Sequence, residues 1–249
     1  MGVVGAAVAT VLGYVVSTII ALIQLFLTKQ KVKPVFKNCL EPQMIKLIFS
    51  YGLPSFVMNA LGAFTVNFAN MFLVRYSDTA VAFFGAYFKV QQLIFMTVNG
   101  LIQGCLPIMR FNYRAKEYGR LKQANKSGTI IATVMMIVGM LLVLIFPKEI
   151  LFLFSASEEM CAFGVPAMRI MSLGFVFSGF SAMIATYEQA TDSIMPGVVV
   201  QLLRQGVLLV PVIWLLNSTV QMTGIWLAFP ITESVTFLVA VVFAKIKNH

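Results

Sequence analysis

Charged residues are scarce in this 249-residue sequence, and histidine and cysteine are scarcer still. Only 11% of the residues are charged and 59% are hydrophobic, whereas a soluble domain has about 25% charged residues. The one histidine is the last residue, His249, and the three cysteines, Cys39, Cys105 and Cys161, have no CxxC spacing. These residues supply no metal or cofactor site, no disulfide framework and no histidine-based hydrolytic triad. We therefore expect neither an enzyme nor a bound cofactor.

Long apolar runs dominate what is present, and a helix needs about 20 consecutive apolar residues to cross a bilayer. Apolar runs bounded by charged residues predict seven spanning helices. Their approximate ranges are 3–27, 47–74, 80–109, 128–146, 161–187, 197–217 and 224–244. The sequence therefore predicts an all-α membrane protein, a polytopic helical bundle whose surroundings are the lipid bilayer.

The net charge of +9 comes from basic residues in short loops, not on one continuous polar face. This pattern favours phospholipid headgroups over nucleic acid as the anionic neighbours. The first and third predicted loops and the carboxyl tail carry five, six and two Lys or Arg residues, thirteen in all. The opposite loops carry only Arg75 and Lys148. Because basic loops stay in the cytoplasm, we expect a cytoplasmic carboxyl terminus and an external amino terminus.

Two predicted spans carry polar side chains at spacings of three or four residues. The stripe on the third span consists of Lys89, Gln92, Met96, Asn99 and Gln103. The stripe on the second span consists of Ser55, Asn59, Ala63, Asn67 and Asn70. Such spacing places each set on one helix face, and polar groups are costly in lipid. The stripes predict a polar transport pathway inside the bundle. The alternative is that the amides only hydrogen-bond neighbouring helices.

Three charged side chains are expected near the middle of the membrane. Counting from the outer ends, Lys89 lies about 14 Å, Arg169 about 12 Å and Glu233 about 14 Å deep. An unpaired charge at that depth is costly, so we expect Glu233 to neutralise Lys89 or Arg169, or to be protonated during part of a cycle. A static ion pair that only fixes helix packing is the alternative. We expect Arg204, on the sixth span, to extend toward cytoplasmic headgroups.

Several segments, taken in order, resemble one family of transporters. The segments are MGVVGAAVATVLG (1–13), SYGLPSFVMNALGAF (50–64), the stretch 81–120, LLRQGVLLVP (202–211) and IWLAFPITE (225–233). They are similar to the sixth, seventh, eighth and last two helices of multidrug and toxic compound extrusion transporters, the MATE family. The resemblance implies twelve helices in two six-helix lobes. It also implies export of amphipathic, often cationic drugs in exchange for protons or sodium ions.

On this resemblance, the chain is a carboxyl-terminal fragment covering helices six to twelve of a multi-pass plasma-membrane transporter. Residues 1–30 correspond to the last helix of the amino-terminal lobe, 31–46 to a cytoplasmic basic linker and 47–249 to the six-helix carboxyl-terminal lobe. The partner then expected is the missing amino-terminal lobe. Some family branches carry a cation-binding glutamate on the seventh helix, but residues 59–70 contain none, so that sodium site does not carry over. The alternatives are a lipid-linked oligosaccharide flippase of the same superfamily and a non-transporting membrane subunit.

Overall fold

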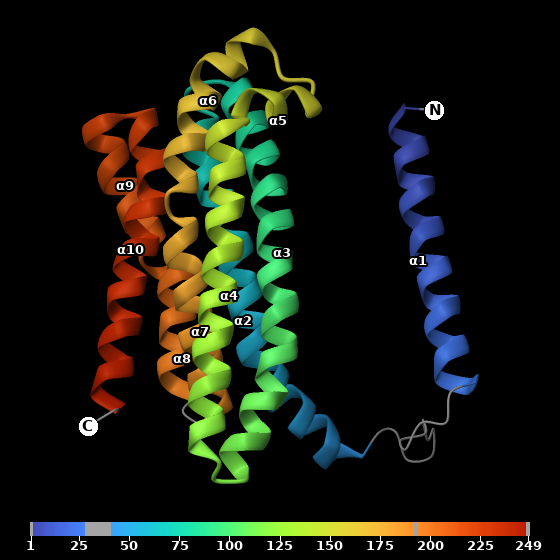
Figure 1. Ribbon diagram of the computed structural model, residues 1–249. Helices are drawn as coiled ribbons and strands as arrows, with labels where there is room; N and C mark the ends of the chain where they lie inside the picture. Colours follow the sequence, from blue (N-terminus) through green and yellow to red (C-terminus); the bar gives the residue numbers. More distant parts are fainter. Residues whose placement is uncertain (1, 28–40, 192–193, 248–249) are drawn as a thin grey trace. The chain divides into compact units, whose positions relative to one another are not determined.

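The computed structural model describes residues 2–27, 41–191 and 194–247, and these ranges contain helices and turns but no strand. Figure 1 shows the helices coloured along the chain. The elements are α1 (Gly2–Leu27), α2 (Pro42–Leu73), α3 (Asp78–Arg114), α4 (Tyr118–Ile145), α5 (Pro147–Leu153), α6 (Glu158–Ser172), α7 (Phe175–Ala190), α8 (Ile194–Leu202), the π-helical η1 (Leu203–Val207), α9 (Leu209–Val220) and α10 (Met222–Lys247). The predicted all-α class is confirmed.

The seven predicted spans correspond to these helices, although two spans are broken. Within the described ranges, five helical segments are long and apolar enough to cross a membrane, and two shorter apolar helices accompany them. The shorter ones are Ala60–Leu73 and Leu209–Val220. The fifth predicted span contains α6 and α7, and the sixth contains α8, η1 and α9. These breaks matter because both lie beside the candidate site.

The chain divides into two compact units, Met1–Leu53 and Pro54–His249. The first unit contains α1, a 26-residue apolar helix with no buried residue among its described side chains. An apolar helix that buries nothing within its own unit suits contact with lipid or with another protein. The second unit contains α2 from Pro54 onward, the elements α3 to α10 and all residues of the candidate site.

The core of the second unit includes an aromatic cluster that joins α3 to α10. The Phe83 ring meets the Trp226 ring edge-on at 5.2 Å between centroids, and Phe84 lies 5.7 Å from Phe229. Buried aromatic pairs of this kind stabilise packing beyond the area they bury. Phe229 is four residues before Glu233, so Glu233 lies one helical turn from this aromatic cluster.

Serine caps begin two of the helices at defined residues. The Ser77 hydroxyl accepts a hydrogen bond from the Ala80 amide at 3.1 Å, and α3 begins at the next residue. The Ser157 hydroxyl does the same for the Met160 amide at 3.2 Å at the start of α6. Each cap satisfies a backbone donor that the first helical turn leaves without a partner.

Candidate functional site

A cavity of about 570 Å³ lies between α2, α3, η1 and α10 in the second unit. Its polar lining consists of Thr65, Gln91, Gln92, Asn99, Gln201, Arg204 and Glu233. Its apolar lining includes Val66, Phe88, Phe95, Leu209 and Phe229. A pocket with aromatic walls and a few convergent polar groups has the composition of a small-molecule site.

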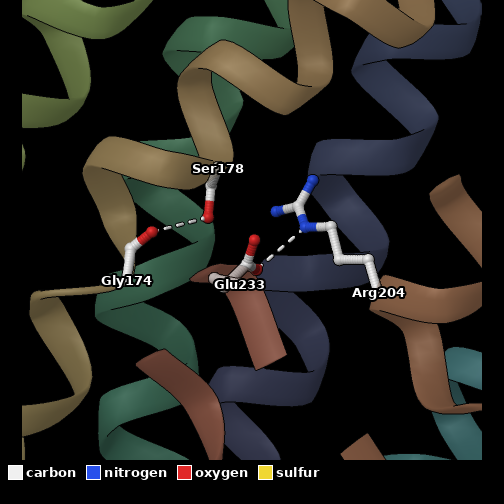
Figure 2. Close-up of polar contacts among 4 residues, drawn as sticks. All are labelled: Gly174, Ser178, Arg204 and Glu233. Carbon is white, nitrogen blue, oxygen red and sulfur yellow. Dashed lines mark hydrogen bonds and ion pairs between the residues drawn. The ribbon is translucent and has the colours of Figure 1, made fainter. Parts of the chain in front are cut away.

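The two charged residues that line the cavity form an ion pair. The Arg204 Nε donates a hydrogen bond to the Glu233 Oε1 at 2.9 Å. Figure 2 shows the two side chains, from η1 and α10, pointing toward one another. Their side chains are only 17% and 14% exposed, so water screens the pair weakly. Charge-assisted bonds of this kind are among the stronger polar contacts in proteins.

An aromatic ring holds the arginine from a second side. The Arg204 guanidinium carbon lies 4.8 Å from the centroid of the Phe95 ring, which also lines the cavity. A guanidinium over an aromatic face is attracted by the negative charge of the ring face. Arg204 is therefore fixed between a carboxylate and an aromatic ring.

The π-helical turn of η1 determines where Arg204 points. The Leu208 amide bonds to the Leu203 carbonyl at 3.2 Å, five residues back, in place of the four-residue step of an α-helix. One extra residue in the turn rotates the side chains before it relative to those after it. Single π-turns inside helices occur frequently at functional sites, which fits the placement of Arg204 at the cavity.

Gly174, at the break between α6 and α7, leaves room for the Glu233 side chain. A Cβ added at Gly174 would lie 3.2 Å from the Pro230 Cα and 3.3 Å from the Glu233 Cγ. One turn later, the buried Ser178 hydroxyl donates to the Gly174 carbonyl at 3.1 Å, as Figure 2 also shows. Glu233 thus packs against a glycine, and a larger residue there would move it.

Comparisons with known proteins identify the family of this chain. The sequence model of the MatE family matches residues 54–215, more than half of the chain. The chain belongs to the MatE family. The multidrug export protein MepA of Staphylococcus aureus strain MSSA476 is 26% identical over 242 residues, covering 96% of this chain and 53% of MepA. MepA of Staphylococcus saprophyticus is 26% identical over 244 residues with the same coverage. The chain therefore spans about half the length of the curated relatives it matches.

Solved structures show that the fold is that of MatE family transporters. An outward-facing multidrug resistance MATE family transporter of the MOP superfamily matches with a TM-score of 0.83 at 20% identity, over 99% of this chain and 56% of that chain. An inward-facing conformation of a multidrug resistance MATE family transporter of the MOP superfamily gives 0.77 at 20% identity, with 99% and 58% coverage. A MOP superfamily transporter from Pyrococcus furiosus, whose pocket of reverse polarity suggests a different function, gives 0.84 at 20% identity, with 99% and 56% coverage.

Three of the residues predicted for the pathway meet in this MatE family cavity: Gln92, Asn99 and Glu233. The Asn67 side-chain amide instead donates to the Ala63 carbonyl of its own helix at 2.9 Å. The remaining predicted residues with described side chains, Lys89, Gln103, Asn70 and Arg169, do not line the cavity. The Asn59 side chain lies outside the described part of the structure.

The expected partner of Glu233 is corrected by the structure. Glu233 pairs with Arg204, not with Lys89 or Arg169. Arg169 is exposed, and its Nε donates to the Leu144 carbonyl at 3.2 Å, one residue before the end of α4. The expectation that Arg204 extends toward cytoplasmic headgroups is also wrong, because its side chain is mostly buried at the cavity. The sequence could have indicated this pair, because the sixth and seventh predicted spans are consecutive and each contains one charged residue.

The described residues hold no group of three or more His, Cys, Asp or Glu side chains placed to bind a metal ion. The cavity offers one carboxylate, one guanidinium, four neutral amides and one hydroxyl. Such groups can bind an organic cation, exchange a proton at the carboxylate or hydrogen-bond a polar ligand.

Enlarging Gly206 is expected to disturb the turn that presents Arg204. An added Cβ would meet the Thr65 Oγ1 directly and lie 3.1 Å from the Leu61 Cδ1. Thr65 cannot easily yield, because it is buried and its hydroxyl donates to the Leu61 carbonyl at 2.9 Å. We expect Gly206→Ala to lower the free energy of unfolding by about 1–3 kcal/mol, as overpacking does. Denaturation in detergent micelles measures this.

The matched control is Gly100→Ala, because a Cβ at Gly100 would have no neighbour within 4 Å. We expect this control to keep or slightly raise stability, since alanine favours helices over glycine. Equal stability of both variants would show that the contact of Gly206 with α2 is not tight.

Proposed function

We propose that the chain is the carboxyl-terminal half of a secondary multidrug exporter that exchanges drugs for a cation. The observation that carries this proposal is the cavity of about 570 Å³ with its Arg204–Glu233 pair. The relatives named multidrug export protein MepA support drugs as the cargo. The substrates proposed are small amphipathic or cationic drugs, and the coupling ion proposed is the proton.

The half-length match supports a division into lobes. We assign residues 1–30 to the last helix of an amino-terminal lobe, 31–46 to a cytoplasmic basic linker and 47–249 to the carboxyl-terminal six-helix lobe. The amino-terminal lobe is then the partner needed for transport, because the complete relatives are about twice as long. The proposed location is the plasma membrane, with the carboxyl terminus in the cytoplasm.

Glu233 is proposed as the group at which drug and proton compete. In the ion-paired state its carboxylate binds Arg204 and leaves little attraction for a second cation. A cationic drug in the cavity competes with Arg204 for the carboxylate, while the Phe88, Phe95 and Phe229 rings contact its apolar part. Protonation of Glu233 removes its charge and releases the drug. Binding energy can drive such a cycle only because drug and proton favour different states of the same group.

The flippase alternative predicts a strongly cationic cavity for lipid-linked phosphates. In the described cavity the single cation, Arg204, is paired with the single anion, Glu233, so its formal charge cancels. Neutral amides make up most of the remaining polar lining. This balance favours cationic and amphipathic drugs over polyanionic lipids as substrates.

Drug uptake by everted membrane vesicles tests the proposal. The vesicles come from a host without drug pumps and contain this chain alone, or this chain together with the amino-terminal half of S. aureus MepA. We expect ethidium uptake when the lumen is acidic, and its loss when an ionophore collapses the pH gradient. Absence of uptake in both preparations, with complete MepA active in the same assay, would contradict the proposal.

A further inference from the structure

The second carboxylate oxygen of Glu233 takes no part in the ion pair with Arg204. Oε1 accepts the bond from Arg204, whereas Oε2 is buried and has no hydrogen-bond partner within the described residues. Buried carboxylate oxygens in native proteins almost always accept a hydrogen bond from protein or from ordered water. A donor for Oε2 is therefore expected on the core side of the carboxylate.

Tyr87 on α3 supplies a hydroxyl of the required kind. Its side chain is fully buried, and its hydroxyl also has no hydrogen-bond partner within the described residues. The ring packs edge-on against Phe229 at 6.5 Å, one helical turn before Glu233. A buried donor and a buried acceptor, each without a partner, thus lie in the same part of the core.

Ser178 on α7 is a third buried polar residue in this part of the core. It is 1% exposed, and its hydroxyl donates to the carbonyl of Gly174, the residue that packs against the Glu233 side chain. Figure 2 shows the bond from Ser178 to Gly174, with Glu233 drawn in the same view. A serine hydroxyl that donates one bond can still accept another. Buried waters typically bridge two to four polar groups, which this set of groups provides.

We infer that a buried water links the Tyr87 hydroxyl to the Glu233 Oε2, with the Ser178 hydroxyl as its third partner. Tyr87 is then a positioning residue that holds one oxygen of the carboxylate from the core. Oε1 remains directed at Arg204 and the cavity, so drug and arginine exchange at that oxygen alone. This inference rests on the proposed role of Glu233 in coupling and adds how its carboxylate is held.

Other charged groups on the elements around α10 do not replace this water. The described ones are Glu158, Glu159 and Arg169 on α6, Glu188 on α7, Arg204 on η1, and Asp78, Lys89, Arg110 and Arg114 on α3. Arg204 forms the only ion pair with Glu233 within the described residues. Glu188 lies 14 residues after Gly174, which is about 21 Å along a helix, so it is far from the residue that packs against Glu233.

Infrared difference spectroscopy of the purified chain in detergent tests the inference. The carboxylate stretching band of Glu233, assigned by its loss in Glu233→Gln, reports the hydrogen bonds of that group. We expect Tyr87→Phe, which removes only the hydroxyl, to shift this band. The matched control is Tyr76→Phe, because the exposed Tyr76 hydroxyl bonds to the Asn217 Oδ1 at 2.8 Å and not to the site. We expect the control to leave the band in place.

A reciprocal measurement covers the case in which Tyr87→Phe does not fold. In the wild-type background with ring-labelled tyrosine, Glu233→Gln is expected to shift one tyrosine C–O band. An unchanged Glu233 band in folded Tyr87→Phe, or unchanged tyrosine bands in Glu233→Gln, would overturn the inference. Neither spectrum requires transport, so failure of the efflux assay would leave this result separate from the test of the proposed function.

Discussion

Replacing Glu233 with glutamine is expected to abolish drug efflux driven by a pH gradient while the protein still inserts into the membrane. Glutamine keeps the size of the side chain and one accepting oxygen, but it cannot exchange a proton. It also cannot attract a cationic drug or Arg204 by charge. Without the exchange, no free energy passes from the gradient to the drug. Everted vesicles that contain Glu233→Gln should therefore take up no more drug than vesicles without the protein, whereas vesicles with the wild-type chain transport the drug.

The matched control for this prediction is Glu159→Gln. Glu159 is exposed in the first turn of α6 and lies outside the cavity, so its loss should leave transport unchanged. Membrane levels of both variants are compared by immunoblot. Gradient-driven uptake by Glu233→Gln at the wild-type rate would reject the coupling role.

Breaking the ion pair from the arginine side is expected to cost more stability than removing both partners. Arg204→Met leaves the Glu233 carboxylate mostly buried without its cation, which should lower the free energy of unfolding by about 3 kcal/mol. The double variant Arg204→Met, Glu233→Met replaces the pair with apolar side chains. We expect it to recover most of the loss, because buried ion pairs and apolar replacements are often of similar stability. Denaturation in mixed micelles measures the wild type, the single variants Arg204→Met and Glu233→Met, and the double variant.

Arg169→Met provides the comparison for an arginine outside the cavity. Arg169 is exposed and its described contact is the bond to the Leu144 carbonyl, so its loss should cost about 1 kcal/mol. Additive losses in the Arg204–Glu233 cycle would mean that the two charges do not stabilise each other in the folded protein. Strong coupling between them is the expected outcome.

Much of the fold could be predicted from the sequence because the bilayer imposes a simple length rule. Apolar runs of about 20 residues mark where helices lie, and neither packing nor loop geometry is needed to find them. The division of the fifth span between α6 and α7, and the π-turn at Leu203–Val207, were not predicted. Both depend on local backbone geometry, which a hydrophobicity pattern does not contain.

The site was predicted in part for a related reason. Helical spacing placed Gln92 and Asn99 on one face, and the structure brings both to the cavity with Glu233. The partner of Glu233 was missed because depth was counted along uninterrupted helices. The π-turn before α9 brings Arg204 to the cavity. The depth estimate, in contrast, predicted that Arg204 extends toward the headgroups. Lys89, at a similar estimated depth, does not line this cavity.

Proton release on drug binding tests the central claim that drug and proton compete at Glu233. Purified protein in weakly buffered detergent solution is mixed with a cationic drug at a pH where Glu233 is protonated, and the pH change is recorded. We predict that the wild-type chain releases about one proton for each drug bound, by linkage between the two ligands. Glu233→Gln should release none. Equal proton release by wild type and Glu233→Gln, or drug binding by wild type without proton release, would contradict the account.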